Sequence, residues 1–402
     1  MAERKLPVGI QSFEKLITEG FIYVDKTDHI YRLVHNNVPY FLCRPRRFGK
    51  SLLLSTIKAY WEGKKELFSG LKIADMEKEN PDPWREYQVF YFDFNGADYR
   101  AGDALEGTID FHLRNWENKY GTFREGDNLA ERFQLLLKKA YEVTGLRSVI
   151  LVDEYDKPLL DTLDDPELKE HNRAVFKSFF SVLKGLDEYI QFSLITGVTK
   201  FDKVSIFSDL NNLEDISADS DYANVCGLTE DEITTNFGIE LNTLAEQYGV
   251  GAQECLMRLK RMYDGYCFSS DTHLKVYNPY SVLTALKKRK FGAYWFETGT
   301  PSFLVKKLKD SCFDVKRLTD KTIYANERLL ADYRADSADF VPLLYQTGYL
   351  TIIDYDKTGE FYTLGLPNEE VEYALMESLM PEYVSDYGAG TGKDILTLRR
   401  YV

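Results

Sequence analysis

Short apolar runs separated by amphipathic stretches predict an α/β protein in which parallel strands alternate with helices. Four runs have the length of a strand and are almost free of charge: residues 38–43, 89–94, 148–153 and 189–196. Continuous apolar runs of this length are typical of strands buried on both faces of a parallel sheet. Between these runs, apolar residues recur at helical spacing, as they do from Leu52 to Trp61. We therefore expect a parallel sheet flanked by helices.

The first of these strands leads into a basic loop and then into a helix. Residues 44–51 read RPRRFGKS and end in Gly-Lys-Ser. In the general pattern G-x-x-x-x-G-K-[ST], the last Gly lets backbone amides approach a phosphate, the Lys reaches the β- and γ-phosphates and the hydroxyl holds Mg²⁺. Gly49, Lys50 and Ser51 fill these positions, whereas Arg44 stands where the first Gly is expected. The alternative is an ordinary turn with a chance Gly-Lys-Ser.

The surroundings of this loop favour phosphate binding. A helix N-terminus presents free N–H groups and a partial positive charge, both of which attract an anion. Arg46 and Arg47 add positive charge, and Phe48 and Leu52 flank the Gly-Lys-Ser triplet. The sequence therefore predicts a nucleotide-binding segment at residues 46–52.

A second strand supplies the acidic residues that such a site requires. The apolar run 148–152 ends in Asp153 and Glu154. Asp153 is placed to complete a Mg²⁺ shell begun by Ser51, and Glu154 to polarise a water for attack on the γ-phosphate. Acidic strand ends are also common in ordinary turns, so the prediction depends on the combination of the two motifs.

A third strand ends in the polar turn that runs from Thr196 to Lys200. In P-loop ATPases that hydrolyse nucleotide, a polar residue at such a strand end helps to position the attacking water. Thr196 and Thr199 are therefore candidate catalytic residues beside Lys50 and Glu154. The alternative is that both hydroxyls cap the turn between strand and loop.

Length and composition indicate a large protein that uses nucleotide with Mg²⁺ rather than a transition metal. The chain has 402 residues, more than the roughly 250–300 at which single cores stop growing. Its five cysteines form no C-x-x-C pair, and its five histidines have no paired-ligand spacing. The apolar runs are shorter than the ~20 residues of a membrane span, and no signal-like stretch follows Met1. We expect a cytoplasmic protein without a membrane partner.

The pattern changes along the chain and predicts four parts. Residues 1–225 are expected to form the core, and residues 226–325, with a helix that opens at Thr229, a helical lid. The order helix, strand, turn, strand, helix predicts a winged-helix-like module at residues 326–384. Residues 385–402 are interpreted as a linker or tail, although 388–394 imitate a phosphate loop.

Charge disfavours nucleic acid as a partner. The chain carries a net charge of −14, and residues 330–402 contain thirteen Asp or Glu against five Lys or Arg. Such a surface repels a phosphate backbone, so a protein partner, self-association or an intramolecular role is expected.

These motifs, in this order, resemble the predicted AAA-ATPase-like family of bacterial proteins. An Arg in place of the first loop Gly is usual in that family, so the resemblance implies a P-loop NTPase core that binds ATP with Mg²⁺. The family is frequently fused to a C-terminal nuclease-like domain, but the residues before Val402 hold no acid-and-lysine nuclease core, and nuclease activity is not expected. The residues that carry the resemblance are 21–27, 44–52, 153–156, 196–201, 263–268, 276–281 and 298–301.

Three functions are consistent with these features. The leading hypothesis is an ATP-binding and ATP-hydrolysing switch of the AAA-like or signal-transducing P-loop type, with an arginine finger from Arg46 or Arg47 or from a neighbouring subunit. The second is a nucleotide-bound or nucleotide-free scaffold that presents the lid and the winged helix to a protein partner. The third is a DNA-processing motor, whose ATPase activity would be stimulated by DNA and would fall with salt. Glu154 favours hydrolysis, because a locked scaffold needs no second acid.

Overall fold

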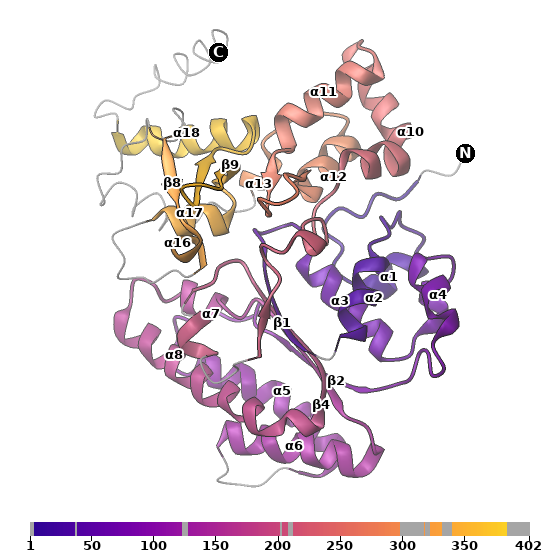
Figure 1. Ribbon diagram of the computed structural model, residues 1–402, viewed down its shortest axis with the longest axis vertical. Helices are drawn as coiled ribbons and strands as arrows, with labels where there is room; N and C mark the ends of the chain where they lie inside the picture. Colours follow the sequence, from indigo (N-terminus) through magenta and orange to yellow (C-terminus); the bar gives the residue numbers. More distant parts are fainter. Residues whose placement is uncertain are drawn as a thin grey trace.

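A five-stranded sheet with helices on both sides forms the first half of the molecule (Figure 1). The strands lie in the order β2-β3-β4-β1-β5, and their four pairings are parallel. The predicted α/β class with a parallel sheet is confirmed. The strands are β1 (Pro39–Cys43), β2 (Gln88–Asp93), β3 (Ser148–Asp153), β4 (Ile190–Gly197) and β5 (Glu214–Asp215). The computed structural model describes residues 4–36, 38–122, 128–201, 203–207, 212–297, 317, 322–331 and 340–383.

The register of the sheet brings three strand ends to one edge. Cys43 of β1 lies opposite Gly197 of β4, and Val152 of β3 lies opposite Ile195. Because parallel strands point the same way, the residues that follow β1, β3 and β4 lie close together. This is the edge of an open α/β sheet at which ligands bind.

Helices of the first half cover the two faces of the sheet. Helices α1–α4 lie on one side of the strands and α5–α8 on the other (Figure 1). Their apolar faces and the strands share one hydrophobic core. The helices are α1 (Phe13–Thr18), α2 (Thr27–His35), α3 (Lys50–Trp61), α4 (Lys72–Met76), α5 (Ala104–Tyr120), α6 (Leu129–Thr144), α7 (Lys157–Leu160), α8 (Pro166–Ser181) and α9 (Lys203–Ile206).

A second hydrophobic core joins the following helices to the N-terminal segment. It contains Phe237, Tyr263 and Leu283, and Leu6 from the start of the chain belongs to it. The helix predicted to open at Thr229 does so with a capping box formed with Glu232. We call this part the helical segment: α10 (Glu230–Tyr248), α11 (Ala252–Tyr263), the hairpin β6 (Tyr266–Cys267) and β7 (Lys275–Val276), α12 (Pro279–Lys288) and α13 (Tyr294–Glu297).

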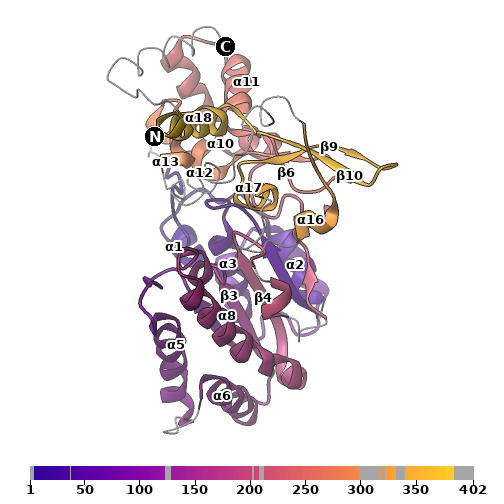
Figure 2. The same cartoon turned by 90° about the vertical axis from the view of Figure 1, so that its left-hand side faces the viewer.

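The last described part, called here the C-terminal module, is an antiparallel sheet with three helices. Its strands lie in the order β8-β10-β9, so residues 323–325 pair with β10, a strand that comes later in the chain. Figure 2 shows this module and the helical segment over one end of the large sheet. The elements are β8 (Ile323–Ala325), α16 (Glu327–Ala331), α17 (Val341–Thr347), β9 (Thr351–Asp356), β10 (Phe361–Gly365) and α18 (Glu369–Tyr383).

Some of the predicted features fall on residues that the structure does not describe. The tail 385–402, with its imitation phosphate loop, and the motif 298–301 lie outside the described residues. Cys43, Cys226, Cys255 and Cys267 are buried free thiols, and Cys312 also lies outside. Within the described residues, no helix has the length and apolarity needed to cross a bilayer.

Gly265 provides a test of the packing between the helical segment and the C-terminal module. Its φ is +101°, and a Cβ there would lie 2.0 Å from the carbonyl oxygen of Pro367. Gly265→Ala should lower the free energy of unfolding by at least about 2 kcal/mol, because it adds a clash to a left-handed backbone. Urea unfolding followed by circular dichroism measures this.

Gly107, inside α5, is the matched control. A Cβ there would meet nothing within 4 Å. Gly107→Ala should raise stability by up to about 1 kcal/mol, because Ala is the better helix former. Equal stability of the two alanine variants would contradict the packing described for Gly265.

Candidate functional site

The loop between β1 and α3 makes a tight turn that ends at the helix N-terminus. Gly49 caps α3 with φ 100°, and Arg47 also has a positive φ of 66°. A Cβ on Gly49 would meet no atom within 4 Å. Glycine is therefore favoured here by the backbone conformation, because a positive φ costs glycine less free energy than it costs other residues. The turn leaves the first N–H groups of α3 available to an anion.

Lys50 is folded back onto its own loop. Its ammonium donates to the carbonyl oxygens of Arg44 at 2.9 Å and Pro45 at 3.2 Å, and its side chain is buried. Phosphate oxygens carry charge and accept stronger hydrogen bonds than carbonyls do. The same ammonium is therefore held close to the loop by acceptors that a phosphate can replace.

Arg44 is part of the protein interior. Its guanidinium donates to the carbonyl oxygens of Cys43, Ser217 and Tyr222 at 2.9, 2.6 and 3.0 Å. It also lies 4.1 Å from the ring centroid of Phe268, a cation–π contact. The residue at the first-Gly position thus anchors the loop to distant segments, a role that no local pattern indicates.

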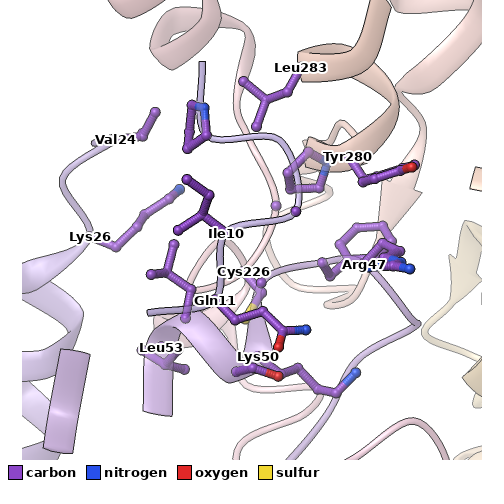
Figure 3. Close-up of a pocket in the computed structure, with 18 of the residues that line it drawn as sticks. Ile10, Gln11, Val24, Lys26, Arg47, Lys50, Leu53, Cys226, Tyr280 and Leu283 are labelled. Atoms are coloured by element: carbon purple, nitrogen blue, oxygen red, sulfur yellow. The ribbon is translucent and has the colours of Figure 1, made fainter. Parts of the chain in front are cut away.

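A cavity of about 350 Å³ lies over the loop (Figure 3). Its polar lining residues include Lys50, Ser51 and Glu154, together with Asn95 and Lys157. Figure 3 shows Gln11 beside Lys50, and Val24 and Leu283 farther away. All of residues 46–52 line the cavity.

Three parts of the chain form the walls of this cavity. The N-terminal part of the wall includes Ile10, and Lys26 lies there too, in an ion pair of 2.6 Å with Glu232 of α10. The helical segment contributes Tyr280, whose ring centroid lies 5.0 Å from the guanidinium carbon of Arg47. Residues 7–11 carry no sequence motif, so their part of the wall could not be predicted from the sequence.

Asp153 is the buried end of β3. One of its carboxylate oxygens accepts from the Thr196 hydroxyl at 2.9 Å, and the other accepts from the Tyr91 hydroxyl at 3.2 Å. The structure thus brings Asp153 and Thr196 together. Tyr91 was missed, because in the sequence it is one more aromatic residue of an apolar strand. Tyr91 lies two residues before Asp93 in the strand that pairs with β3, and this position near the strand end could have indicated a contact with Asp153.

Glu154 faces the cavity from a strained backbone. Its φ is 53°, in the left-handed region that non-glycine residues seldom adopt. Burial raises the pKa of its carboxyl, and Asp153 and Asp156 raise it further, against the opposing effect of Lys50 and Arg46. A carboxylate with a raised pKa is a better proton acceptor at neutral pH than an ordinary one.

Asp156 closes the turn that follows β4. Its carboxylate accepts from the N–H groups of Val198 and Thr199 and from the Thr199 hydroxyl. Thr199 is completely buried, and this arrangement corresponds to the turn-capping alternative for that residue. A Cβ on Gly197 would lie 2.7 Å from the same carboxylate, so the turn requires glycine there. Asp156 itself had no predicted role, although it stands three residues after Asp153.

Phe48 fixes the loop from its outer side. Its buried ring makes edge-to-face contacts with Tyr266 at 4.8 Å and Phe268 at 5.6 Å between centroids. The carbonyl oxygen of Phe48 accepts from the N–H of Gly227 at 3.2 Å. The phosphate-type loop is therefore held from both sides, and its cationic end opens into the cavity beside a carboxylate suited to accept a proton.

Comparisons with known proteins agree with this geometry. A family model described as a predicted AAA-ATPase matches residues 7–207, which include the loop, Asp153, Glu154 and the turn after β4. A protein of Azotobacter chroococcum mcd 1, described as an uncharacterized protein in the vnfD 5′ region, is 38% identical over 390 residues. That match covers 96% of this chain and 72% of the relative. The chain belongs to the predicted AAA-ATPase family.

Proposed function

We propose that this protein binds ATP with Mg²⁺ in the cavity over the loop and hydrolyses it as a nucleotide-controlled switch. The observation that carries the proposal is the convergence of Lys50, Ser51 and Glu154 on one cavity, with Asp153 buried at the adjacent strand end. These are the side chains that phosphoryl transfer to water requires. Membership of the predicted AAA-ATPase family supports nucleotide binding.

Ser51 in the cavity and Asp153 at the adjacent strand end fit a magnesium ion. Ser51 supplies a hydroxyl and Asp153 a carboxylate, the oxygen ligands that Mg²⁺ prefers. Among the residues that the structure describes, no group of three or more His, Cys, Asp or Glu side chains could hold a metal ion. Nucleotide sites commonly hold Mg²⁺ with only one or two protein ligands. When bound, the ion would neutralise charge on the β- and γ-phosphates.

The proton chemistry is assigned to Glu154. Its carboxylate faces the cavity and would orient a water and accept its proton. Thr196 would hold the Asp153 carboxylate through its hydroxyl, and Thr199, bound to Asp156, would keep the turn after β4 in place. Lys50 would move from the loop carbonyls to the phosphates.

The part of the cavity away from Lys50 is suited to a nucleotide base. Ile10, Val24 and Leu283 offer apolar surface there. Because Tyr280 and Leu283 come from the helical segment, we assign that segment the role of a lid. We interpret the C-terminal module as winged-helix-like and, given the acidic charge of residues 330–402, as a site for a protein partner.

Removal of the loop lysine tests nucleotide binding. Lys50→Ala should weaken MgATP binding at least about 10-fold, because it deletes a charge-assisted hydrogen bond to phosphate. Isothermal titration calorimetry measures the change. Lys78→Ala is the matched control: this residue is exposed and pairs with Asp75, so its removal should leave binding unchanged. If the wild-type protein binds no nucleotide, the proposal fails.

Replacement of the proposed base tests hydrolysis. Glu154→Gln should lower the turnover number of the Mg²⁺-dependent ATPase by about 10²–10⁴-fold and leave MgATP binding in place, because the amide cannot accept the proton. Phosphate release measures turnover. Exposed Glu142, in a surface pair with Lys139, gives the control Glu142→Gln. Equal turnover of wild type and Glu154→Gln would contradict the role of Glu154, and binding without turnover in wild type would favour the scaffold.

The raised pKa of Glu154 predicts the acid side of the pH profile. Its ordinary value is 4.5, and burial shifts it upward. Protonation removes the base, so the turnover number should fall about tenfold per unit as pH drops below a pKa that lies above 4.5. Arg46→Gln, measured at saturating ATP, should move this limb to still higher pH, because Arg46 lowers the pKa of Glu154. A shift of the acid side of the pH profile to lower pH in Arg46→Gln would contradict the effect assigned to Arg46 on the pKa of Glu154.

A further inference from the structure

The turn formed by residues 196–200 is buried, and its hydrogen bonds lead almost entirely to the sheet core. Within the described residues, a single hydrogen bond joins it to the C-terminal module. The turn is therefore bonded directly to the acidic strand end and to the phosphate-type loop. Its core partners include Arg44, Cys43, Asp153, Tyr155, Asp156 and Asp215.

The exception is Gln346, on α17. Its side-chain oxygen accepts from the N–H of Lys200 at 2.8 Å, and its amide donates to the carbonyl oxygen of Leu330 in α16 at 3.0 Å. The side chain is 3% exposed, and a buried amide with both ends bonded has a defined orientation. Figure 2 shows α16 and α17 over the end of the sheet. One side chain thus joins two helices of the module to the turn.

The same region of the molecule also touches the phosphate-type loop. Gly348, which follows α17, lies so close to Pro45 that a Cβ on it would be 2.8 Å from the proline ring. The Trp295 indole donates to the carbonyl oxygen of Arg46 at 3.0 Å and packs against Tyr349 at 5.3 Å between ring centroids. Contacts at residues 346–349 therefore reach both the loop and the turn after β4.

We propose that Gln346 is a positioning residue for ATP hydrolysis and couples turnover to the placement of the C-terminal module. The inference rests on the proposed function of the site. By holding Lys200, Gln346 keeps the turn in the place where Thr196 can fix the Asp153 carboxylate. A change at the phosphates then reaches α17 through this turn, and the reverse holds as well.

The loop side of the site offers a reason for such coupling. Lys50 donates to the carbonyl oxygen of Pro45, and Pro45 lies against Gly348. When the ammonium moves to a phosphate, that carbonyl loses its partner and the contact beneath α17 changes. The two nucleotide states therefore present different surfaces to residues 346–348, and a difference in contacts is what allows a ligand to bias a conformation.

The test compares two isosteric changes in the same module of the full chain. Gln346→Met removes both polar contacts of Gln346 and keeps its length. Thr351→Val removes the buried hydroxyl that bonds Cys267 and Gly265, and it leaves the bond between Gln346 and Lys200 in place. Gln346→Met should lower the turnover number at least about 10-fold and leave the KM and Kd for MgATP within about twofold. Thr351→Val should lower unfolding stability and leave the turnover number unchanged.

A second measurement follows the module directly. Hydrogen exchange at α17 should differ between the wild-type protein with MgADP and with a non-hydrolysable ATP analogue, and the difference should disappear in Gln346→Met. An unchanged turnover number in Gln346→Met, a fall shared by Thr351→Val, or the absence of a nucleotide-dependent difference in wild type would each overturn the coupling alone. A wild-type chain that binds no MgATP would overturn the proposed function and the coupling with it.

Discussion

A buried arginine is the interaction on which the rest of the site depends. Arg44 is 1% exposed and has three backbone carbonyls and one aromatic face as its partners. Burial of an isolated cation would cost several kcal/mol, and oriented carbonyl dipoles with a ring face offset that cost. The carbonyls belong to the end of β1 and to residues 217 and 222, and the ring belongs to the helical segment. One side chain therefore holds together the loop, the sheet edge and the part of the molecule that covers it.

Three carboxylates within four residues have different surroundings, and the surroundings separate their chemistry. Asp156 is saturated by backbone N–H groups and a hydroxyl. Asp153 accepts hydrogen bonds from the hydroxyl groups of Thr196 and Tyr91. Glu154 alone of the three lines the cavity, with a pKa raised by burial. The same functional group therefore has three different environments within one strand end, and the environment sets its chemistry.

The cavity lies where three parts of the chain meet. The N-terminal segment, the sheet edge and the helical segment each contribute a wall, and Lys26 with Glu232 already joins the first and third. A ligand held by all three walls would stabilise their arrangement by mass action, because it binds the assembled form alone. A ligand in this cavity would therefore couple the three parts to one another.

Structural features that depend on residues close together in the chain could be predicted from the sequence. The apolar runs indicated the parallel strands, the Gly-Lys-Ser triplet marked the loop before α3, and the pattern at Thr229 and Glu232 marked the start of α10. The acidic strand end at Asp153 was visible for the same reason. Each is set by chemistry within a few residues, where steric limits and burial leave few choices.

Contacts between side chains that are far apart in the sequence could be seen only in the tertiary structure. Arg44 stands at the first-Gly position and anchors the loop, Asp156 carried no predicted role and closes a turn, and Gln346 reaches Lys200 from 146 positions away. Such contacts arise from the packing of elements on one another, and burial makes each polar group find a partner wherever the packing provides one. No local pattern encodes that choice, because it depends on all the elements at once.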